Sequence, residues 1–179
     1  RWRKHPANPV LDLKLHGDLS IRDWRDPFVF RHDGQAYLVC GGNVREDRQY
    51  GAVNVYRAES GDLTRWKHLG VLFKHPDPRV RNIECPNFFR LGDRWVLIIS
   101  PHGPTECFTG SLDLATWKFT PSWRAVLDAG NMYAPNCYDD SRGRKLMWGW
   151  INGFQGGHGW NGCMTFPRVL SVEPACALR

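Results

Sequence analysis

The feature that most constrains this chain is a strand start that occurs three times with a proline at the same place. The three segments are Arg25-Asp26-Pro27, Glu84-Cys85-Pro86 and Tyr133-Ala134-Pro135, and each leads into a strand-like segment with aromatic residues. A polar turn and a second aromatic segment follow each time. Two of the three starts carry a carboxylate, and we take Asp26 and Glu84 to occupy one equivalent point of the repeat. Acids at equivalent points indicate an active site built on internal symmetry.

The spacing of the repeat predicts the fold. Pro27 and Pro86 are 59 positions apart, and Pro86 and Pro135 are 49 apart. The segment Asp62-Leu63-Thr64-Arg65-Trp66 returns 51 positions later as Asp113-Leu114-Ala115-Thr116-Trp117. A period of about 40 to 50 residues in a strand-rich chain is typical of β-propeller blades. Equivalent residues of successive blades surround one axis, so we expect the two acids to face a common funnel.

The expected secondary structure is almost entirely β. Short segments rich in Val, Tyr and Phe alternate with Asp, Gly and Pro, and no segment keeps a helical apolar period. We predict an all-β fold with roughly three four-stranded blades. The expected strands are 28–31, 36–41, 51–58, 67–72, 87–91, 94–100, 106–112 and 117–120, with others from 136 onward.

Three blades do not close a propeller, because they leave unpaired strand edges and an exposed inner face. One solution is a four-bladed ring in which residues 1–24 and the C-terminus complete a blade. The other, which we favour, is that the chain is part of a larger propeller. The first residues, Arg1-Trp2-Arg3-Lys4-His5, do not resemble a signal peptide, and the compartment is not indicated.

Composition argues against several functional classes. The net charge of +6 comes mainly from arginines scattered along the chain, without a basic block, so we expect no nucleic-acid partner. No apolar run approaches the roughly 18 residues that a membrane span needs. The six cysteines form no C-x-x-C pair and are expected to be mostly free thiols. No metal-ligand cluster is present, and the Gly-rich stretch 149–162 lacks the ending of a phosphate-binding loop.

The order and spacing of several motifs resemble glycoside hydrolase family 32, the β-fructofuranosidase group of invertases, levanases and inulinases. Each motif is weak alone, but together they run through nearly the whole chain. They are Asn8-Pro9-Val10-Leu11, Arg25-Asp26-Pro27, Glu84-Cys85-Pro86, Asp128-Ala129-Gly130 with Tyr133-Ala134-Pro135, Trp148-Gly149-Trp150, Gly159-Trp160 and Pro167-Arg168-Val169-Leu170.

The resemblance implies a five-bladed β-propeller, followed in most members by a β-sandwich, that hydrolyses sucrose or fructans without metal or cofactor. It implies Glu84 as the acid/base and Asp26 as the transition-state stabiliser of a retaining mechanism. The family's nucleophilic aspartate lies in a W-M-N-D-P-N-G-like motif of the first blade, which does not occur in this sequence. We therefore expect residues 1–179 to be a partial catalytic propeller domain, lacking the first blade and any β-sandwich and inactive alone.

Retaining chemistry defines the tasks of the two acids. Such enzymes hold two carboxyl groups about 5 to 5.5 Å apart, one attacking the anomeric carbon and one protonating the leaving oxygen. Glu84 fits the second task and should carry a proton when substrate binds. Asp26 should accept hydrogen bonds from fructosyl hydroxyls as the ring flattens, with Arg25 keeping it ionised and oriented. Without the repeat, an Asp before Pro would be interpreted as an Asx turn.

Further residues are assigned to sugar binding through the same resemblance. Asp128 and Tyr133, near the third strand start, are expected to line the sugar site. Trp150 and Phe154 are candidates for contact with sugar. Cys85 is expected to be a packing residue behind Glu84. Ile83 stands where many relatives carry tryptophan, which leaves the shape of the leaving-group subsite open.

Two other functional hypotheses remain. An inverting propeller hydrolase of the arabinanase and xylosidase type also uses three acids, with carboxyl groups farther apart. A non-catalytic carbohydrate-binding or protein-interaction propeller would not need acids at repeated strand starts. The sequence does not decide between hydrolysis and fructosyl transfer, nor among sucrose, sucrose phosphate, inulin and levan, and the oligomeric state is not indicated.

Overall fold

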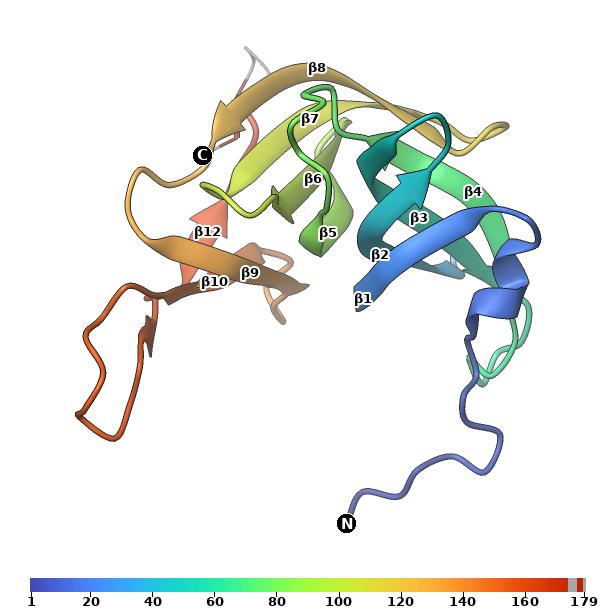
Figure 1. Ribbon diagram of the computed structural model, residues 1–179, viewed down its shortest axis with the longest axis horizontal. Coiled ribbons are helices and arrows are strands. Elements are labelled where there is room, and N and C mark those ends of the chain that lie inside the picture. The colour runs from blue at the N-terminus through green and yellow to red at the C-terminus, as the bar shows by residue number, and fades with distance from the viewer. Residues whose placement is uncertain (174–176, 179) are drawn as a thin grey trace.

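The computed structural model describes residues 1–173, 177 and 178, which form three antiparallel sheets around a common centre (Figure 1). A short 3-10 helix, η1 (Leu13–His16), precedes them. The first sheet contains β1 (Ser20–His32), β2 (Gln35–Arg45), β3 (Gln49–Ala58) and β4 (Trp66–Lys74). The second contains β5 (Glu84–Leu91), β6 (Arg94–Ser100), β7 (Glu106–Asp113) and β8 (Lys118–Val126), and the third contains β9 (Met132–Asp139), β10 (Lys145–Ile151), β11 (Cys163–Met164) and β12 (Arg168–Leu170).

The first two sheets are simple meanders in which each strand pairs with the next one along the chain. The third sheet differs, because β11 and β12 pair with different parts of β10 and together form one interrupted strand. The prediction of three all-β blades is confirmed. The closed four-bladed alternative is wrong: residues 1–19 contain only η1, and the three sheets are separate among the described residues.

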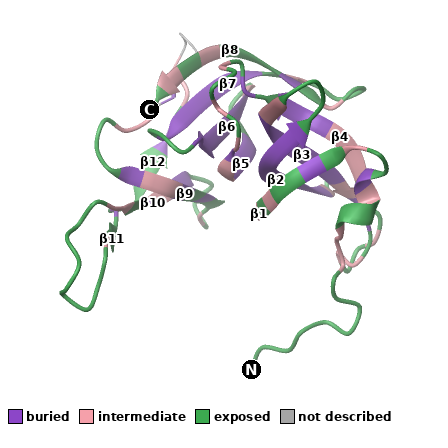
Figure 2. Cartoon of the chain, viewed as in Figure 1, coloured by how far each residue is buried: buried purple, intermediate pink, exposed green. Residues whose placement is uncertain are grey.

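The second sheet lies between the other two sheets, and both of its faces are covered. Leu97 and Ile99 pack into one apolar cluster with residues of the first sheet, and Val96 and Ile98 pack into another with residues of the third sheet. All four side chains are fully buried, which explains why β6 has no polar alternation. Figure 2 shows buried residues concentrated in strands such as β2, β3, β6 and β7, whereas β1 is largely exposed.

The outer face of the first sheet is covered by the chain that leads into β1. Leu11 and Leu19 of this segment, and Trp24 near the start of β1, pack against the buried residues of that face. This segment crosses the sheet and adds no blade of its own. Within the described residues, no helix has the length and apolar character that a membrane crossing requires.

Each innermost strand carries an irregularity at its proline motif. In β1, Arg25 lies opposite Gly41 and Phe28 lies opposite Val39, so three steps along β1 match two steps along β2. The same mismatch occurs in β5 and β9. Such bulges re-aim side chains and suit proline, which cannot donate to the ladder. The first motif therefore lies inside β1 and the other two at the first residues of β5 and β9, although we had expected each motif to precede its strand.

Candidate active site

The three motifs converge through the residue that stands two places before each proline. Arg25 Nη1 donates a hydrogen bond to Glu84 Oε1 at 2.7 Å, and the Tyr133 hydroxyl donates to Glu84 Oε2 at 2.7 Å. The sequence separations, 59 and 49, equal the spacings of the repeat. Arg25, Glu84 and Tyr133 are thus the equivalent positions. The expectation that the two acids are equivalent is wrong, because Asp26 stands one place closer to its proline.

Asp26 belongs to the neighbouring set of equivalent positions, together with Cys85. The backbone N–H of Cys85 donates to Asp26 Oδ2 at 2.9 Å, and its thiol lies 3.5 Å from the same oxygen. Burial, reinforced by the charge of Asp26, raises the pKa of the Cys85 thiol to about 12, so the thiol stays protonated and can donate. Arg25 was expected to orient Asp26, but its guanidinium bonds to Glu84 and Asp23 instead.

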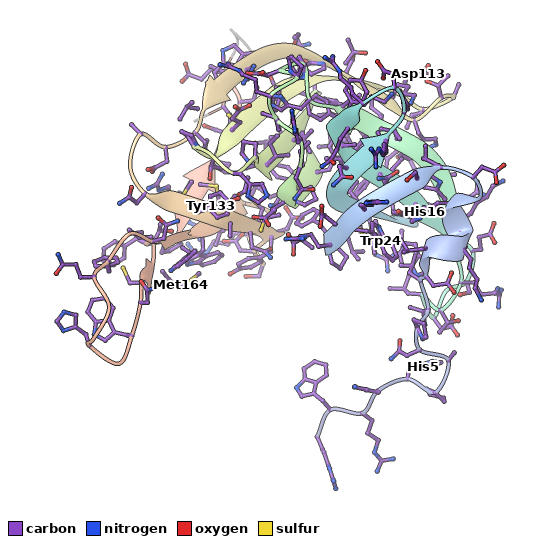
Figure 3. All side chains as sticks on the ribbon, in the orientation of Figure 1. His5, His16, Trp24, Asp113, Tyr133 and Met164 are labelled. Atoms are coloured by element: carbon purple, nitrogen blue, oxygen red, sulfur yellow. The ribbon has the colours of Figure 1, made fainter. Side chains whose placement is uncertain are left out.

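Glu84 is largely enclosed, with 17% of its side chain exposed. Arg25 and Tyr133 contact its two oxygens, and His102 Nε2 lies 3.6 Å from Oε1. The Tyr133 hydroxyl also lies 3.4 Å from the Ser100 carbonyl and accepts a hydrogen bond from the His102 backbone at 3.3 Å. Burial, and then the hydrogen bond to Glu84, raise the pKa of Tyr133, which keeps its hydroxyl a neutral donor. Figure 3 labels Tyr133 on β9.

A pair of glycines in β2 brings Glu84 to this place. The N–H of Ile83 donates to the carbonyl of Gly42 at 3.0 Å, and a Cβ at Gly41 would overlap the Ile83 carbonyl oxygen. The chain before β5 can therefore approach β2 closely, which sets Glu84 beside β1. Ile83 is fully buried in the core between the first two sheets, so it supports the site from behind.

Four polar residues that sequence reasoning missed complete the surroundings of Glu84. Asn43 Nδ2 donates to Asp23 Oδ2 at 2.9 Å and to Asn82 Oδ1 at 3.2 Å. Asn82 Nδ2 lies 3.1 Å from His102 Nε2. Asp23 also lies 3.4 Å from Arg25 Nη2. A glycine inside a strand often marks a close backbone approach, so Gly41-Gly42 is the sequence signal that could have pointed to β2 at this place, although not to these four residues.

A cavity of about 200 Å³ lies between the three inner strands. Asp26, Cys85, Asn87 and Pro135 are among the residues that line it. Asn87 ties two of the strands together: its Nδ2 donates to the carbonyls of Cys85 and Pro135, and its Oδ1 accepts from the N–H of Cys137. This buried amide therefore helps to fix the spacing of β5 and β9, together with the hydrogen bond between Tyr133 and Glu84.

The remaining predicted sugar-binding residues lie farther from the acids. Asp128 forms an ion pair with Arg168 at 2.8 Å; burial alone would raise its pKa, but the hydrogen bonds from Arg168 and the Gly130 N–H hold it below its usual value. Trp150 lies opposite Tyr133 in the β9–β10 ladder. Phe154 is 40% exposed on the long loop after β10 and packs edge-to-face on Trp160. Among the described side chains, no hydrogen bond or ion pair joins Asp128, Trp150 or Phe154 to Glu84.

In the part of the chain that the structure describes, the His, Cys, Asp and Glu side chains are dispersed. No group of three or more His, Cys, Asp or Glu side chains is placed there to hold a metal ion. Cys40, Cys85, Cys107, Cys137 and Cys163 are free thiols. Cys176, also predicted to be a thiol, lies outside the described residues.

Comparison with known proteins shows which family the sequence matches. The model of the "Glycosyl hydrolases family 32 N-terminal domain" matches residues 1–177. Sucrose-6-phosphate hydrolase of Salmonella typhimurium is 33% identical over 171 residues, which cover 82% of this chain and 36% of that protein. Raffinose invertase of Escherichia coli is 30% identical over 170 residues, which cover 84% of this chain and 35% of that protein.

Solved structures agree with the sequence matches. A GH32 β-fructofuranosidase of Bombyx mori, in a mutant complex with sucrose, superimposes with a TM-score of 0.79 at 28% identity and covers 97% of this chain and 39% of that one. Fructan 1-exohydrolase IIa of Cichorium intybus gives a TM-score of 0.80 at 24% identity, covers 99% and 38% of the two chains, and supports the fold alone. The three sheets thus match part of a GH32 propeller, and the chain spans just over a third of the length of these relatives.

Proposed function

The chain belongs to glycosyl hydrolase family 32, and from this premise we propose that it forms part of an enzyme that releases fructose from sucrose or fructans with retention of configuration. In this proposal Glu84 is the acid/base and Asp26 stabilises the transition state. The attacking aspartate is supplied by polypeptide outside these 179 residues. The observation that carries the proposal is that the motifs of Glu84 and Asp26, far apart in sequence, meet in one hydrogen-bonded cluster at the inner strands.

Glu84 would act twice. Its proton passes to the glycosidic oxygen as the bond to the leaving group breaks, and the resulting carboxylate later takes a proton from the attacking water. Arg25 suits the interval between these steps, because its guanidinium stabilises the carboxylate at 2.7 Å. The Tyr133 hydroxyl has the Ser100 carbonyl as a second acceptor, so it can turn away when Glu84 carries a proton.

Asp26 is suited to binding sugar hydroxyls. Its Oδ2 accepts from the Cys85 backbone, and no donor among the described residues contacts Oδ1. A carboxylate oxygen with open lone pairs can accept hydrogen bonds that strengthen as positive charge develops on the fructosyl ring. The backbone bond fixes the orientation of the group before substrate arrives.

The proposed substrates are sugars that end in a fructofuranosyl group. The names of the relatives refer to sucrose 6-phosphate, raffinose and fructan, and the Bombyx mori structure contains sucrose. These compounds share a fructosyl unit whose anomeric carbon is the reacting centre. Trp150, opposite Tyr133, is proposed to contact the sugar, together with Phe154, Asp128 and Arg25.

Replacing Glu84 in the full-length protein tests the acid/base assignment. We expect Glu84→Gln to lower kcat on sucrose by about 10² to 10⁴-fold, because the amide cannot deliver a proton. The exposed Glu59→Gln is the matched control and should keep full activity. Sucrose hydrolysis at the wild-type rate by Glu84→Gln contradicts the assignment. Proton NMR of the first-formed fructose anomer reports retention, and inversion would instead favour the arabinanase-like alternative.

The isolated 179-residue chain tests the origin of the nucleophile. We expect no fructose release from it, because no motif for the attacking aspartate occurs in its sequence. A coupled fructose assay on a purified preparation of this chain measures the release. Turnover that is lost on Glu84→Gln in this chain would show that the nucleophile lies within it.

A further inference from the structure

A circuit of polar side chains surrounds one oxygen of Glu84. Its members contact one another in sequence, each within 3.6 Å of the next. Asn43 is fully buried in it, whereas the His102 side chain is 55% exposed. The members, in order, are Asp23, Arg25, Glu84, His102, Asn82 and Asn43, returning to Asp23.

Asp23 gives the circuit a direction. A carboxylate only accepts hydrogen bonds, so Asn43 must turn its Nδ2 toward Asp23. The same Nδ2 faces Asn82, which must therefore present its Oδ1. That orientation directs Asn82 Nδ2 at His102 Nε2, 3.1 Å away. Because an amide nitrogen only donates, Nε2 must accept, and the ring proton of His102 belongs on Nδ1.

We propose that this circuit holds His102 as a neutral imidazole with its proton on Nδ1, so that Nε2 presents a proton acceptor to Glu84. His102 is then a positioning residue for the proton that Glu84 carries. The inference rests on the proposed function, since it concerns the acid/base role of Glu84. The separation of 3.6 Å between Nε2 and Glu84 Oε1 places the two groups within a small side-chain rotation of a hydrogen bond.

The other neighbours of Glu84 explain why an acceptor matters. Arg25 can only donate, and Tyr133 donates in this structure. On the side of Oε1, Arg25 alone would leave a protonated carboxyl group without an acceptor for its O–H, which disfavours the form that the first chemical step requires. His102 supplies that acceptor on the side of Oε1. A proton on Nε2 would instead point one donor at another, Asn82 Nδ2, and would favour the ionised form of Glu84.

The groups that face His102 come from three elements. Glu84 begins β5, Tyr133 of β9 accepts from the His102 backbone N–H, and Asn82 lies in the segment before β5. Arg25 and Asp23 of β1 act on it through Glu84 and the two asparagines. Asp23 is therefore the one carboxylate that fixes the tautomer without contacting the imidazole.

Nitrogen-15 NMR of the imidazole in the full-length protein tests the tautomer directly, with His102→Gln to assign the signals. We expect a protonated Nδ1 and an unprotonated Nε2 at neutral pH. Asp23→Asn removes the directing carboxylate and should raise the population with the proton on Nε2. The proposal is overturned if His102 of the wild-type protein carries its proton on Nε2. It is also overturned if Asp23→Asn leaves the tautomer populations unchanged. This readout needs no turnover, so it stands even where the proposed function fails.

Kinetics with two substrates separate positioning from simple structural support. His102→Leu should lower kcat on sucrose about tenfold but leave an aryl β-fructofuranoside, whose leaving group needs little protonation, within about twofold. His102→Gln, whose amide oxygen can accept, should recover most of the sucrose activity. Asp23→Asn should show the same split, and the exposed Asp18→Asn should not. Equal losses on both substrates, or no recovery with Gln, overturn the proposal.

Discussion

The residue before each motif proline has an unusual backbone conformation. Asp26, Cys85 and Ala134 have φ angles of 56°, 47° and 50°, in the left-handed region that side chains rarely adopt. A residue before proline normally prefers an extended backbone. The same strain at the same point of three strands follows from the bulge, which turns the preceding residue toward the centre. Arg25, Glu84 and Tyr133 meet there for this reason.

Ala134 allows the strain to be measured without touching the acids. A left-handed alanine costs about 1–2 kcal/mol, whereas glycine costs about 0.5–1 kcal/mol of unfolded-state entropy, so Ala134→Gly should stabilise the fold by roughly 0.5 kcal/mol. Ala125→Gly, within the regular ladder of β8, is the control and should destabilise it by about 0.5–1 kcal/mol. Urea unfolding measures both. Destabilisation at both sites would show that the Ala134 backbone is relaxed.

At the scale of elements, the repeat predicted which strands are equivalent but not how their ends meet. The second repeated segment was informative: Asp62 and Asp113 each accept from the backbone N–H two residues on, so both segments form the same turn. Asn82 and His102 could not be predicted, because they lie in connections without periodicity. Their position depends on the bridge between Gly42 and Ile83, a contact between segments far apart in the chain.

The interrupted outer strand of the third sheet also escaped prediction. The loop between β10 and β11 contains four glycines with positive φ, Gly153, Gly157, Gly159 and Gly162, which carry the chain away from the sheet. The sequence had indicated only that further strands follow from residue 136 onward, without their bounds. A short β11 and a separate β12 are the result.

Gly41→Ala tests whether the close approach of two elements builds the site. The new Cβ would overlap the backbone carbonyl of Ile83, which cannot move as a flexible side chain could. We expect a loss of about 1–3 kcal/mol in stability, as for overpacking, together with a fall in sucrose hydrolysis as Glu84 shifts. Gly61→Ala, where no heavy atom lies within 4 Å, should change neither. Unchanged activity with reduced stability would show that the bridge between Gly42 and Ile83 supports the fold but does not position Glu84.

At the scale of the whole molecule, a buried polar cluster joins the N-terminal segment to the first sheet. His16 Nε2 lies 2.6 Å from the Tyr56 hydroxyl, and His68 Nε2 lies 3.0 Å from Asn54 Oδ1. The two imidazole rings meet edge-to-face at 4.8 Å (Figure 3 labels His16 and Trp24). Burial lowers the pKa of both histidines, and burial together with the charge of His16 brings that of His68 to about 4.

These lowered pKa values predict that the fold loses stability in mild acid. The unfolded chain binds a proton at His68 near pH 6.5, whereas the folded protein does so only near pH 4. Between these values the unfolded state holds more protons, so stability falls as pH decreases from about 6.5 to 4, with no such loss above that window. Allowing for partial solvent screening, we expect a loss on the order of 1–2 kcal/mol from His68.

Denaturant unfolding of wild type and His68→Gln at pH 7.5, 5.5 and 4.5 measures this contribution. The glutamine cannot titrate, so the variant should lose less stability between pH 7.5 and 4.5 than wild type, even if it is less stable throughout. His5→Gln is the control, because His5 is exposed and its loss should leave the pH dependence unchanged. Parallel curves for wild type and His68→Gln would mean that the cluster accepts a proton without opening. A smaller slope for the variant would show that the contact between the N-terminal segment and the first sheet depends on a neutral His68, since protonation of its half-buried ring places a charge between two packed surfaces.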